Sequence, residues 1–227
     1  MIIMINDKLY MSIQTNLQSI QNEIHSINDR KVDIVGVTKN HSIKDITKLI
    51  EAGVVHIGEN RWQEAKDKLY QIPSSVTKHF IGHLQTNKAK EVVRGFDMIQ
   101  SIDSFKLAKK INDECQKIGK VMPILIQVNT SNEPQKSGIK PEEALNLLEE
   151  VYPLPNIELR GLMTIGINSE NDKDIRQCFK TLKRLFDKLK QTNFQKLEIL
   201  SMGMSNDYKI AIEEGSTMVR IGTRLFN

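Results

Sequence analysis

The sequence has few aromatic residues, few cysteines and no long hydrophobic run. Aromatic residues make up 5% of the 227 residues, and no aromatic cluster lies beside a basic stripe, where nucleic-acid bases would stack. The net charge of +4 comes from lysines that are interleaved with glutamate and aspartate, as on an ordinary solvated surface. We therefore expect no nucleic-acid partner and only a mild, unspecific preference for small anions.

The apolar stretches are also too short for a membrane protein. The first five residues, MIIMI, are followed by Asn6 and Asp7, so this stretch is too short for a signal-peptide core or a membrane span. Cys115 and Cys178 fall on apolar positions of predicted helices, which indicates buried free thiols in a reducing compartment. Because no low-complexity segment or Gly/Ser linker interrupts the chain, we expect a single cytoplasmic domain over residues 1–227.

Before the first predicted strand, apolar residues recur at steps of three and four. This spacing places them on one side of a helix over about residues 7–28, which we expect to lie across the body of the fold. The members of this stripe are Leu9, Ile13, Leu17, Ile20, Ile24 and Ile27.

The rest of the chain alternates short apolar runs with amphipathic segments. Eight runs have the length of strands that are buried on both faces, and they cover residues 32–39, 54–58, 78–82, 96–101, 122–129, 158–165, 197–201 and 217–222. The alternation predicts an α/β fold, a single (β/α)8 TIM-type barrel preceded by the N-terminal helix. A doubly wound open sheet is the alternative, because the number of strands does not prove closure.

A lysine stands at the end of the first of these strands. The stretch VDIVGVTK at 32–39 is largely apolar and ends in Lys39. Lysine is seldom buried without a partner, so on this stretch alone a solvent-exposed strand end is the simplest interpretation. In a barrel, however, active residues gather at the carboxyl ends of the strands. The same end would carry Asn60 and His83 after the second and third strands.

The last two strand ends are rich in serine, glycine and threonine. Loops after the seventh and eighth strands of a barrel often bind phosphate through backbone amides and small hydroxyl groups, although serine and glycine are also ordinary turn residues. With Arg220 between this pocket and Lys39, the set suits pyridoxal 5'-phosphate held as a Schiff base. The candidates for the phosphate are Ser201, Gly203, Ser205, Gly222 and Thr223.

The chain resembles the pyridoxal phosphate homeostasis protein family, which is similar in fold to the barrel domain of alanine racemase. The matching segments run in order along the chain: VGVTK at 35–39, IGENRWQE at 57–64, HFIGHLQTNK at 79–88, IQVNTSNEPQKSGI at 126–139, RGLMTI at 160–165, LSMGMSNDY at 200–208 and GSTMVRIGT at 215–223. The resemblance implies a protein that binds pyridoxal phosphate and takes part in the intracellular homeostasis of this cofactor.

The resemblance also implies roles for single residues. Lys39 would be the Schiff-base lysine, Asn60 would lie beside the cofactor ring, and Arg220 would face the pyridine nitrogen. Ser201, Gly222 and Thr223 would hold the phosphate. His83 departs from the family pattern, in which proline or serine stands before Leu-Gln, so its role is left open and a surface position is expected.

Arg220 favours a carrier over an efficient enzyme. A guanidinium group only donates hydrogen bonds, so it would leave the pyridine nitrogen unprotonated and the ring a weak electron sink. Only four residues follow Thr223, so we expect no second domain to supply the tyrosine acid/base that alanine racemases use. We therefore assign no catalytic residue.

The sequence thus predicts a monomer that holds pyridoxal phosphate on Lys39 and passes it on to apo-enzymes. Lys136, in a polar loop, is a candidate for a second, transient attachment. A single-domain amino-acid racemase and an aldolase-type barrel that acts on phosphorylated sugars are the alternatives.

Overall fold

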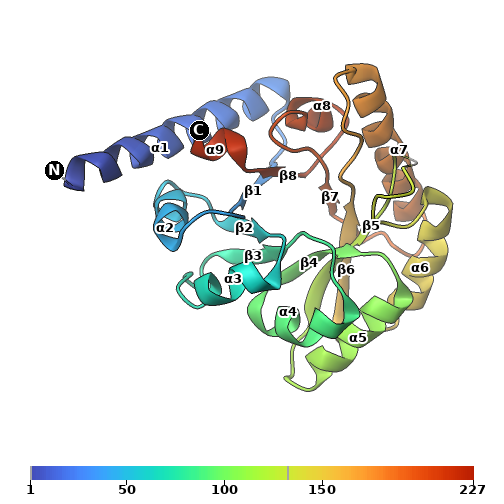
Figure 1. The fold of residues 1–227 in the computed structure, drawn as a ribbon. Helices are drawn as coiled ribbons and strands as arrows, with labels where there is room; N and C mark the ends of the chain where they lie inside the picture. Colours follow the sequence, from blue (N-terminus) through green and yellow to red (C-terminus); the bar gives the residue numbers. More distant parts are fainter. Residues whose placement is uncertain (1, 132) are drawn as a thin grey trace.

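Eight parallel strands follow one another around a closed barrel in sequence order, and the last pairs with the first. The structure is a computed structural model that describes residues 2–131 and 133–227, with side chains from residue 9 onward. Closure confirms the predicted (β/α)8 barrel and excludes the open sheet (Figure 1). The strands are β1 (Asp33–Val37), β2 (His56–Glu59), β3 (Thr77–Phe80), β4 (Met98–Ile102), β5 (Met122–Gln127), β6 (Ile157–Met163), β7 (Ile199–Ser201) and β8 (Met218–Ile221).

Helices connect the strands and cover the outside of the barrel (Figure 1). Their starts follow local signals, as α2 shows: the Ser42 hydroxyl accepts the backbone N–H of Asp45, and the Asp45 carboxylate accepts that of Ser42, which forms a capping box. The helices are α2 (Ile43–Glu51), α3 (Trp62–Leu69), α4 (Ala89–Gly95), α5 (Phe105–Gln116), α6 (Ala144–Val151), α7 (Asp172–Lys190), α8 (Tyr208–Glu213) and α9 (Thr223–Phe226), with 3-10 turns at Thr86–Lys88 and Pro141–Glu143.

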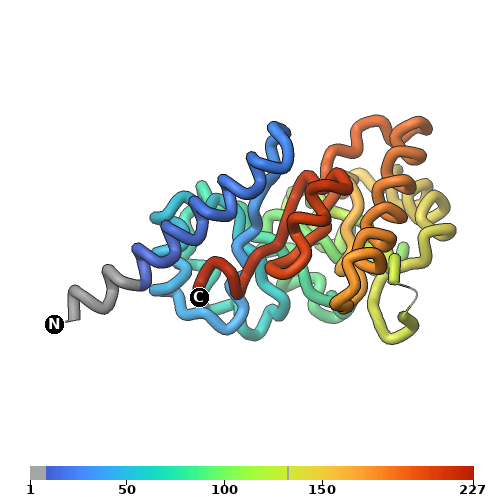
Figure 2. The backbone as a smooth tube through the Cα atoms, turned by 90° about the horizontal axis from the view of Figure 1, so that it is seen from above, coloured from blue at the N-terminus to red at the C-terminus, as the bar shows by residue number. Residues whose placement is uncertain are grey.

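The N-terminal helix α1 (Ile2–Ile27) lies along α8 and α9, as Figures 1 and 2 both show. The central part of its predicted stripe is buried, with Ile13 and Ile20 fully enclosed, and Leu9 and Ile27 at the two ends are partly buried. The Asn16 amide donates to the backbone carbonyls of Leu225 and Asn227 at 3.2 and 2.8 Å. Helix α1 therefore supports α9, which follows directly after β8.

Both cysteines lie on the buried faces of helices that cover the barrel. Cys115 on α5 and Cys178 on α7 are buried free thiols, as predicted. Burial raises the pKa of the Cys115 thiol to about 11.

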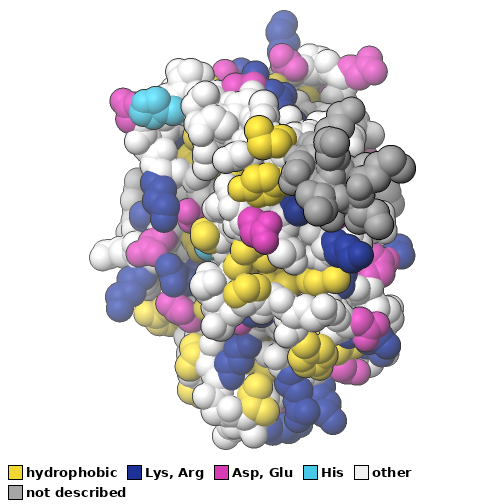
Figure 3. Space-filling model, turned by 90° about the vertical axis from the view of Figure 1, so that its left-hand side faces the viewer, with side chains coloured by type: hydrophobic (Ala, Val, Ile, Leu, Met, Phe, Trp, Pro, Cys, Tyr) yellow, Lys and Arg dark blue, Asp and Glu magenta, His cyan; other side chains and the backbone are white. Residues whose placement is uncertain are grey.

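The surface carries charges of both signs. On the face shown in Figure 3, basic and acidic side chains are interspersed with apolar ones and no single sign dominates. Within residues 2–131 and 133–227, none of the helices combines the length and apolar character needed to cross a bilayer.

Candidate cofactor site

Strands β1 and β8 bring Lys39 close to the loop that follows β8. Val35 pairs with Arg220, so the two strand ends leave the barrel side by side. A Cβ added at Gly222 would lie only 3.3 Å from Cβ of Val37. Lys39 stands two residues after Val37 in the sequence and is exposed at the barrel mouth. The structure thus places the lysine and the Gly222 backbone on neighbouring strand ends.

The backbone that carries Lys39 is held from below by a buried ion pair. Lys68 and Glu59 lie 2.6 Å apart, with side chains that are 14% and 2% exposed. The same Glu59 oxygen accepts the Thr38 hydroxyl at 2.7 Å, and Lys68 donates to the Thr38 carbonyl at 3.3 Å. Directly after Lys39, Asn40 adopts φ 63°, a left-handed conformation that asparagine tolerates. These contacts fix the point at which the chain turns away from the barrel.

Arg220 is a buried cation with a fixed orientation. One guanidinium nitrogen donates to the Ser201 hydroxyl and another to the backbone carbonyl of Thr164, both at 2.7 Å. Burial lowers the pKa of Arg220 to about 10, and the nearby Asp207 carboxylate opposes this effect. The guanidinium group therefore stays protonated at neutral pH and can only donate hydrogen bonds.

The loop after β7 folds back onto the start of α9 and brings Ser205 to it. The Ser205 hydroxyl accepts backbone N–H groups of Gly222 and Arg224 at 3.3 and 3.5 Å. The turn depends on Gly203, whose φ is 97° and where an added Cβ would lie 2.6 Å from the Ala211 side chain. Small hydroxyl and amide groups thus converge at the beginning of a helix, an arrangement that suits a phosphate.

Ser201 makes different contacts from Ser205: its side chain is fully buried and accepts from Arg220. Its own O–H donates to Gln100 at 2.7 Å. The physical reason is its position as the last residue of β7, inside the barrel, whereas Ser205 lies four residues later in the loop. Ser201 therefore orients Arg220. The role in phosphate binding that the resemblance implied for Ser201 stays a prediction.

The predicted residues after β2 and β3 lie on another side of the mouth. Asn60 and His83 line a pocket of about 270 Å³ together with Trp62 and Phe80. A Cβ added at Gly82 would lie 2.1 Å from the Asn60 carbonyl oxygen, so the two loops are in close contact. The place of Asn60 beside a cofactor ring stays a prediction.

His83 and Lys136 link the loops that surround the mouth. His83 is largely exposed, as expected, and its Nδ1 lies 3.3 Å from the Ser137 hydroxyl and 3.8 Å from an Asp103 oxygen. Lys136 pairs with Glu133 and donates to the Gly166 carbonyl at 2.8 Å. In this conformation the Lys136 amine is engaged within its own loop region.

The four tyrosines lie away from the strand ends, as the sequence indicated. Tyr208 is buried under α1, and its hydroxyl donates to Glu23. Tyr10 is on α1, and Tyr70 and Tyr152 are exposed after helices α3 and α6. None of them is placed to act as an acid or base at the barrel mouth.

His79 and Gln100 were not predicted as site residues, yet they continue the Arg220 and Ser201 network into the barrel. Gln100 bonds His79 Nδ1 at 3.0 Å, and both side chains are fully buried. The available signal was a polar residue within an apolar run, since each lies inside a predicted strand.

Comparison with known proteins agrees with this geometry. The family model for the alanine racemase N-terminal domain matches residues 10–227. A pyridoxal phosphate homeostasis protein of Haemophilus influenzae is 39% identical over 226 residues, which cover 95% of both chains. The protein of the same name from Aquifex aeolicus is 40% identical over 194 residues, 85% of each chain. The chain belongs to the pyridoxal phosphate homeostasis protein family.

Solved structures from the family and from a larger enzyme have a similar fold. PipY of Synechococcus elongatus, solved with pyridoxal phosphate bound, has a TM-score of 0.85 and 34% identity and covers 95% of this chain and 100% of its own. An alanine racemase of Clostridium difficile has a TM-score of 0.78 at 18% identity, and the match spans 93% of this chain but 59% of the racemase. The second likeness shows the shared barrel fold alone.

Proposed function

We propose that the protein binds pyridoxal phosphate at the carboxyl end of its barrel, covalently attached to Lys39, and serves the homeostasis of this cofactor by holding and releasing it. The observation that carries the proposal is Arg220, a buried cation held by Ser201 and Thr164. It lies on β8, between the strand end that bears Lys39 and the loop that bears Ser205. The names of the family members and the PipY complex support the choice of cofactor.

The residues present fit the chemical groups of pyridoxal phosphate. Ser205 with the Gly222 and Thr223 backbone offers hydroxyl and amide groups to a phosphate. Arg220 offers a donor to the ring nitrogen, and the exposed Lys39 amine offers a nucleophile to an aldehyde. When bound, the cofactor supplies an aldehyde that reacts reversibly with amines and a ring that can withdraw electrons.

The residues around the ring favour a carrier over an efficient enzyme. Arg220 holds its proton firmly at neutral pH because its pKa is about 10. A ring nitrogen beside this donor stays unprotonated and withdraws electrons weakly. The tyrosines lie elsewhere, so none of them offers an acid or base to the second face of the ring. The proposed function is therefore to retain and release pyridoxal phosphate, with apo-enzymes as recipients. The protein would act in the cytoplasm and as a monomer. A single-domain racemase is not favoured.

Borohydride trapping tests the attachment. The purified protein is mixed with pyridoxal phosphate, reduced, digested and examined by mass spectrometry. We expect a permanent modification on Lys39 that is absent after Lys39→Ala. Lys136→Ala serves as the matched control, because this lysine also lies near the mouth and its loss should leave the Lys39 adduct unchanged. Trapping that is unaffected by Lys39→Ala would show that the cofactor assignment is wrong.

Turnover separates the carrier from an enzyme. The loaded protein is incubated with a panel of amino acids, and chirality and keto-acid release are followed over many equivalents of substrate. We expect no sustained turnover, whereas addition of an apo-enzyme should remove the cofactor and restore that enzyme's activity. Sustained turnover that depends on Lys39 would instead identify a racemase or a related enzyme.

A further inference from the structure

Five polar side chains form a continuous hydrogen-bonded chain through the barrel. At the carboxyl end, Arg220 donates to Ser201, and Ser201 donates to Gln100 Oε1, both at 2.7 Å. Gln100 Nε2 lies 3.0 Å from His79 Nδ1, and His79 Nε2 lies 3.1 Å from His56 Nδ1. Five different strands contribute one residue each, and all except His56 are buried.

Arg220 sets the direction of every bond in this chain. A guanidinium group cannot accept, so Ser201 accepts from Arg220 and passes its own proton to the Gln100 oxygen. The Gln100 amide nitrogen then donates to His79 Nδ1, which must be unprotonated. His79 is consequently a neutral ring with its proton on Nε2, and it donates to Nδ1 of His56. Burial lowers the pKa of His79 to about 3, in agreement with a permanently neutral ring.

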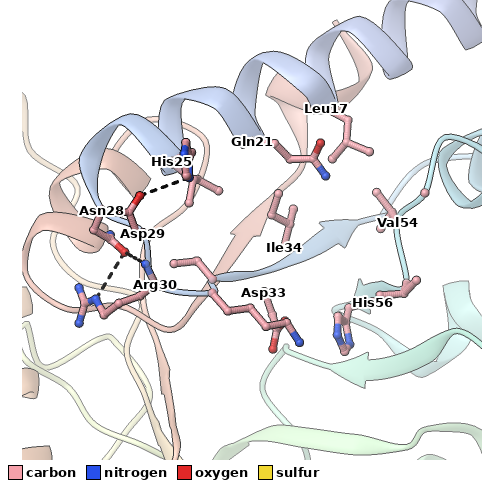
Figure 4. Close-up of a pocket in the computed structure, with 15 residues that line it drawn as sticks. Leu17, Gln21, His25, Asn28, Asp29, Arg30, Asp33, Ile34, Val54 and His56 are labelled. Atoms are coloured by element: carbon pink, nitrogen blue, oxygen red, sulfur yellow. Dashed lines mark hydrogen bonds and ion pairs between the residues drawn. The ribbon is translucent and has the colours of Figure 1, made fainter.

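The far end of the chain opens into a cavity at the amino-terminal face of the barrel. His56 lines this cavity of about 390 Å³, which lies between the end of α1 and the start of β1 (Figure 4). Burial lowers the pKa of His56, while the nearby Asp33 carboxylate on β1 raises it and the preceding Lys31 lowers it further. Across the cavity, His25 of α1 pairs with Asp29 at 3.6 Å. His56, at the end of the hydrogen-bonded series, is thus the member that can exchange protons with solvent.

We propose that His79, Gln100 and Ser201 are positioning residues that link the protonation of His56 at one end of the barrel to the hold on Arg220 at the other. The inference rests on the proposed function in one respect, namely that Arg220 faces the cofactor. A proton taken up by His56 weakens cofactor binding, and bound cofactor makes His56 harder to protonate, because coupling between two sites is reciprocal.

The coupling follows from the number of donors. A protonated His56 carries N–H groups on both ring nitrogens, so its Nδ1–H would face the N–H of His79 at 3.1 Å. The two N–H groups repel each other, and this repulsion favours a turn of the buried His79 ring away from His56. Once the ring turns, its Nδ1 no longer accepts from the Gln100 amide, and the Gln100 oxygen that accepts the Ser201 hydroxyl is no longer held in place. The order that holds Arg220 is lost.

Ring-nitrogen NMR of the cofactor-free protein tests the chain directly. We expect His79 to carry its proton on Nε2, with none on Nδ1, and to show no titration between about pH 5 and 8. Gln100→Glu replaces the donor by an acceptor and should bring a proton to His79 Nδ1. Gln100→Leu, of similar size, should cut the chain and move the pKa of His56 up toward the ordinary value. A Gln100 that merely fills space would leave the proton on His79 unchanged in the glutamate variant.

Cofactor affinity tests the coupling. The dissociation constant of pyridoxal phosphate is measured at about pH 5.5 and 8 for the wild type, His56→Asn, Gln100→Leu and His25→Asn. We expect the weakening at low pH to be at least about fivefold greater in the wild type than in the first two variants. His25→Asn is the matched control, because His25 lines the same cavity outside the chain, and it should behave as the wild type. Titration of the cofactor itself is common to all four proteins and cancels.

The outcomes separate this inference from the proposed function. Equal pH dependence in all four proteins, or a proton on His79 Nδ1 in the wild type, overturns the inference even if the cofactor binds tightly. A wild-type protein that takes up no cofactor contradicts the proposed function and the affinity coupling with it. The ring-nitrogen signals then still show whether the hydrogen bonds from Arg220 to His56 all run in the proposed direction, because these signals are recorded without cofactor.

Discussion

Lys68 on α3 and Glu59 at the end of β2 form an ion pair at 2.6 Å beneath the peptide that leads into Lys39. Because the pair also bonds the hydroxyl and carbonyl of Thr38, two elements outside β1 fix the position of Lys39, the proposed attachment residue. An attachment site that must present an amine in one place gains this precision from neighbours that never touch the ligand.

Removing Lys68 should destabilise the fold strongly. Lys68→Met leaves the Glu59 carboxylate buried without its partner, which costs about 3–5 kcal/mol of the free energy of unfolding. Replacing both residues, by Lys68→Met with Glu59→Gln, should cost clearly less, since no uncompensated charge is left. Urea unfolding followed by circular dichroism gives these values. The matched control is Lys109→Met, which breaks the exposed pair with Asp113 and should stay within about 1 kcal/mol of the wild type; equal losses at the two lysines would contradict the role of the buried pair.

Ser205 and Ser201 should respond differently to the phosphate of the ligand. Ser205→Ala removes a hydroxyl beside the Gly222 amide and should weaken binding of pyridoxal phosphate by about tenfold, the loss expected for a hydrogen bond to a charged group. Binding of pyridoxal, which has no phosphate, should hardly change. Ser201→Ala loosens Arg220 and should weaken both ligands to a similar degree. Equilibrium titration by absorbance compares the four dissociation constants, and a phosphate-selective effect at Ser201 instead would return that residue to the phosphate site.

Gly82 should not tolerate a side chain. An added Cβ would lie 2.1 Å from the Asn60 carbonyl oxygen and 2.8 Å from its carbonyl carbon, so Gly82→Ala must push the loop after β2 aside. We expect a loss of about 1–3 kcal/mol in the free energy of unfolding, as for an overpacked core. Gly119→Ala is the comparison for bulk alone, because no atom lies within 4 Å of its added Cβ, although its φ of 64° adds some strain. The result is checked by urea unfolding, and an unchanged stability in Gly82→Ala would contradict the close approach.

The stability of the protein should fall in mildly acidic solution because of His79. The pKa of this histidine is about 3 in the folded protein and about 6.5 in an unfolded chain. Its contribution is therefore complete above pH 6.5 and declines as the pH falls toward 3, by up to about 1.4 kcal/mol for each pH unit. The lowered pKa of His56 acts in the same direction.

Urea unfolding at about pH 5 and 7 measures this dependence. His79→Gln should flatten it by nearly one proton, even if the variant is less stable at both values. His25→Gln removes an exposed histidine and should leave the slope unchanged. A slope that is the same in all three proteins would show that another group governs the acid response.

The sequence was sufficient for the barrel because its signals are local. An apolar run such as Met122–Gln127 shows by length and composition that it is a strand buried on both faces, and the regular alternation with helices leaves few other folds. Boundaries were less exact: residues 54–58 were predicted as the second strand, but β2 runs from His56 to Glu59, and the Val54 N–H is bonded to the Leu49 carbonyl of α2 instead of a strand. Helix α9 was missed, since four residues are too few to show a period.

The interior network could not be read from the sequence because its contacts join distant residues. Ser201 and Ser205 belong to the same small-residue segment, and only the register of β7 shows that the first lies inside the barrel. His79 was part of an apolar run, and its partners His56 and Gln100 come from the two flanking strands. Arg220 was identified as a site residue, but its fixed orientation depends on Ser201 and Thr164, which precede it by many residues.

The burial of Cys115 and Cys178 has a consequence for the proposed cofactor. Like amines, cysteine side chains can attack an aldehyde, but the reactive form is the thiolate. Burial raises the pKa of both thiols and so disfavours the thiolate. At neutral pH both thiols are therefore protonated and would not compete with Lys39 for the aldehyde of the proposed ligand. A carbon–nitrogen bond formed by Lys39 would be open to exchange with another amine. The burial of the two thiols would thus leave the proposed cofactor on a bond that the lysine of a receiving enzyme can replace.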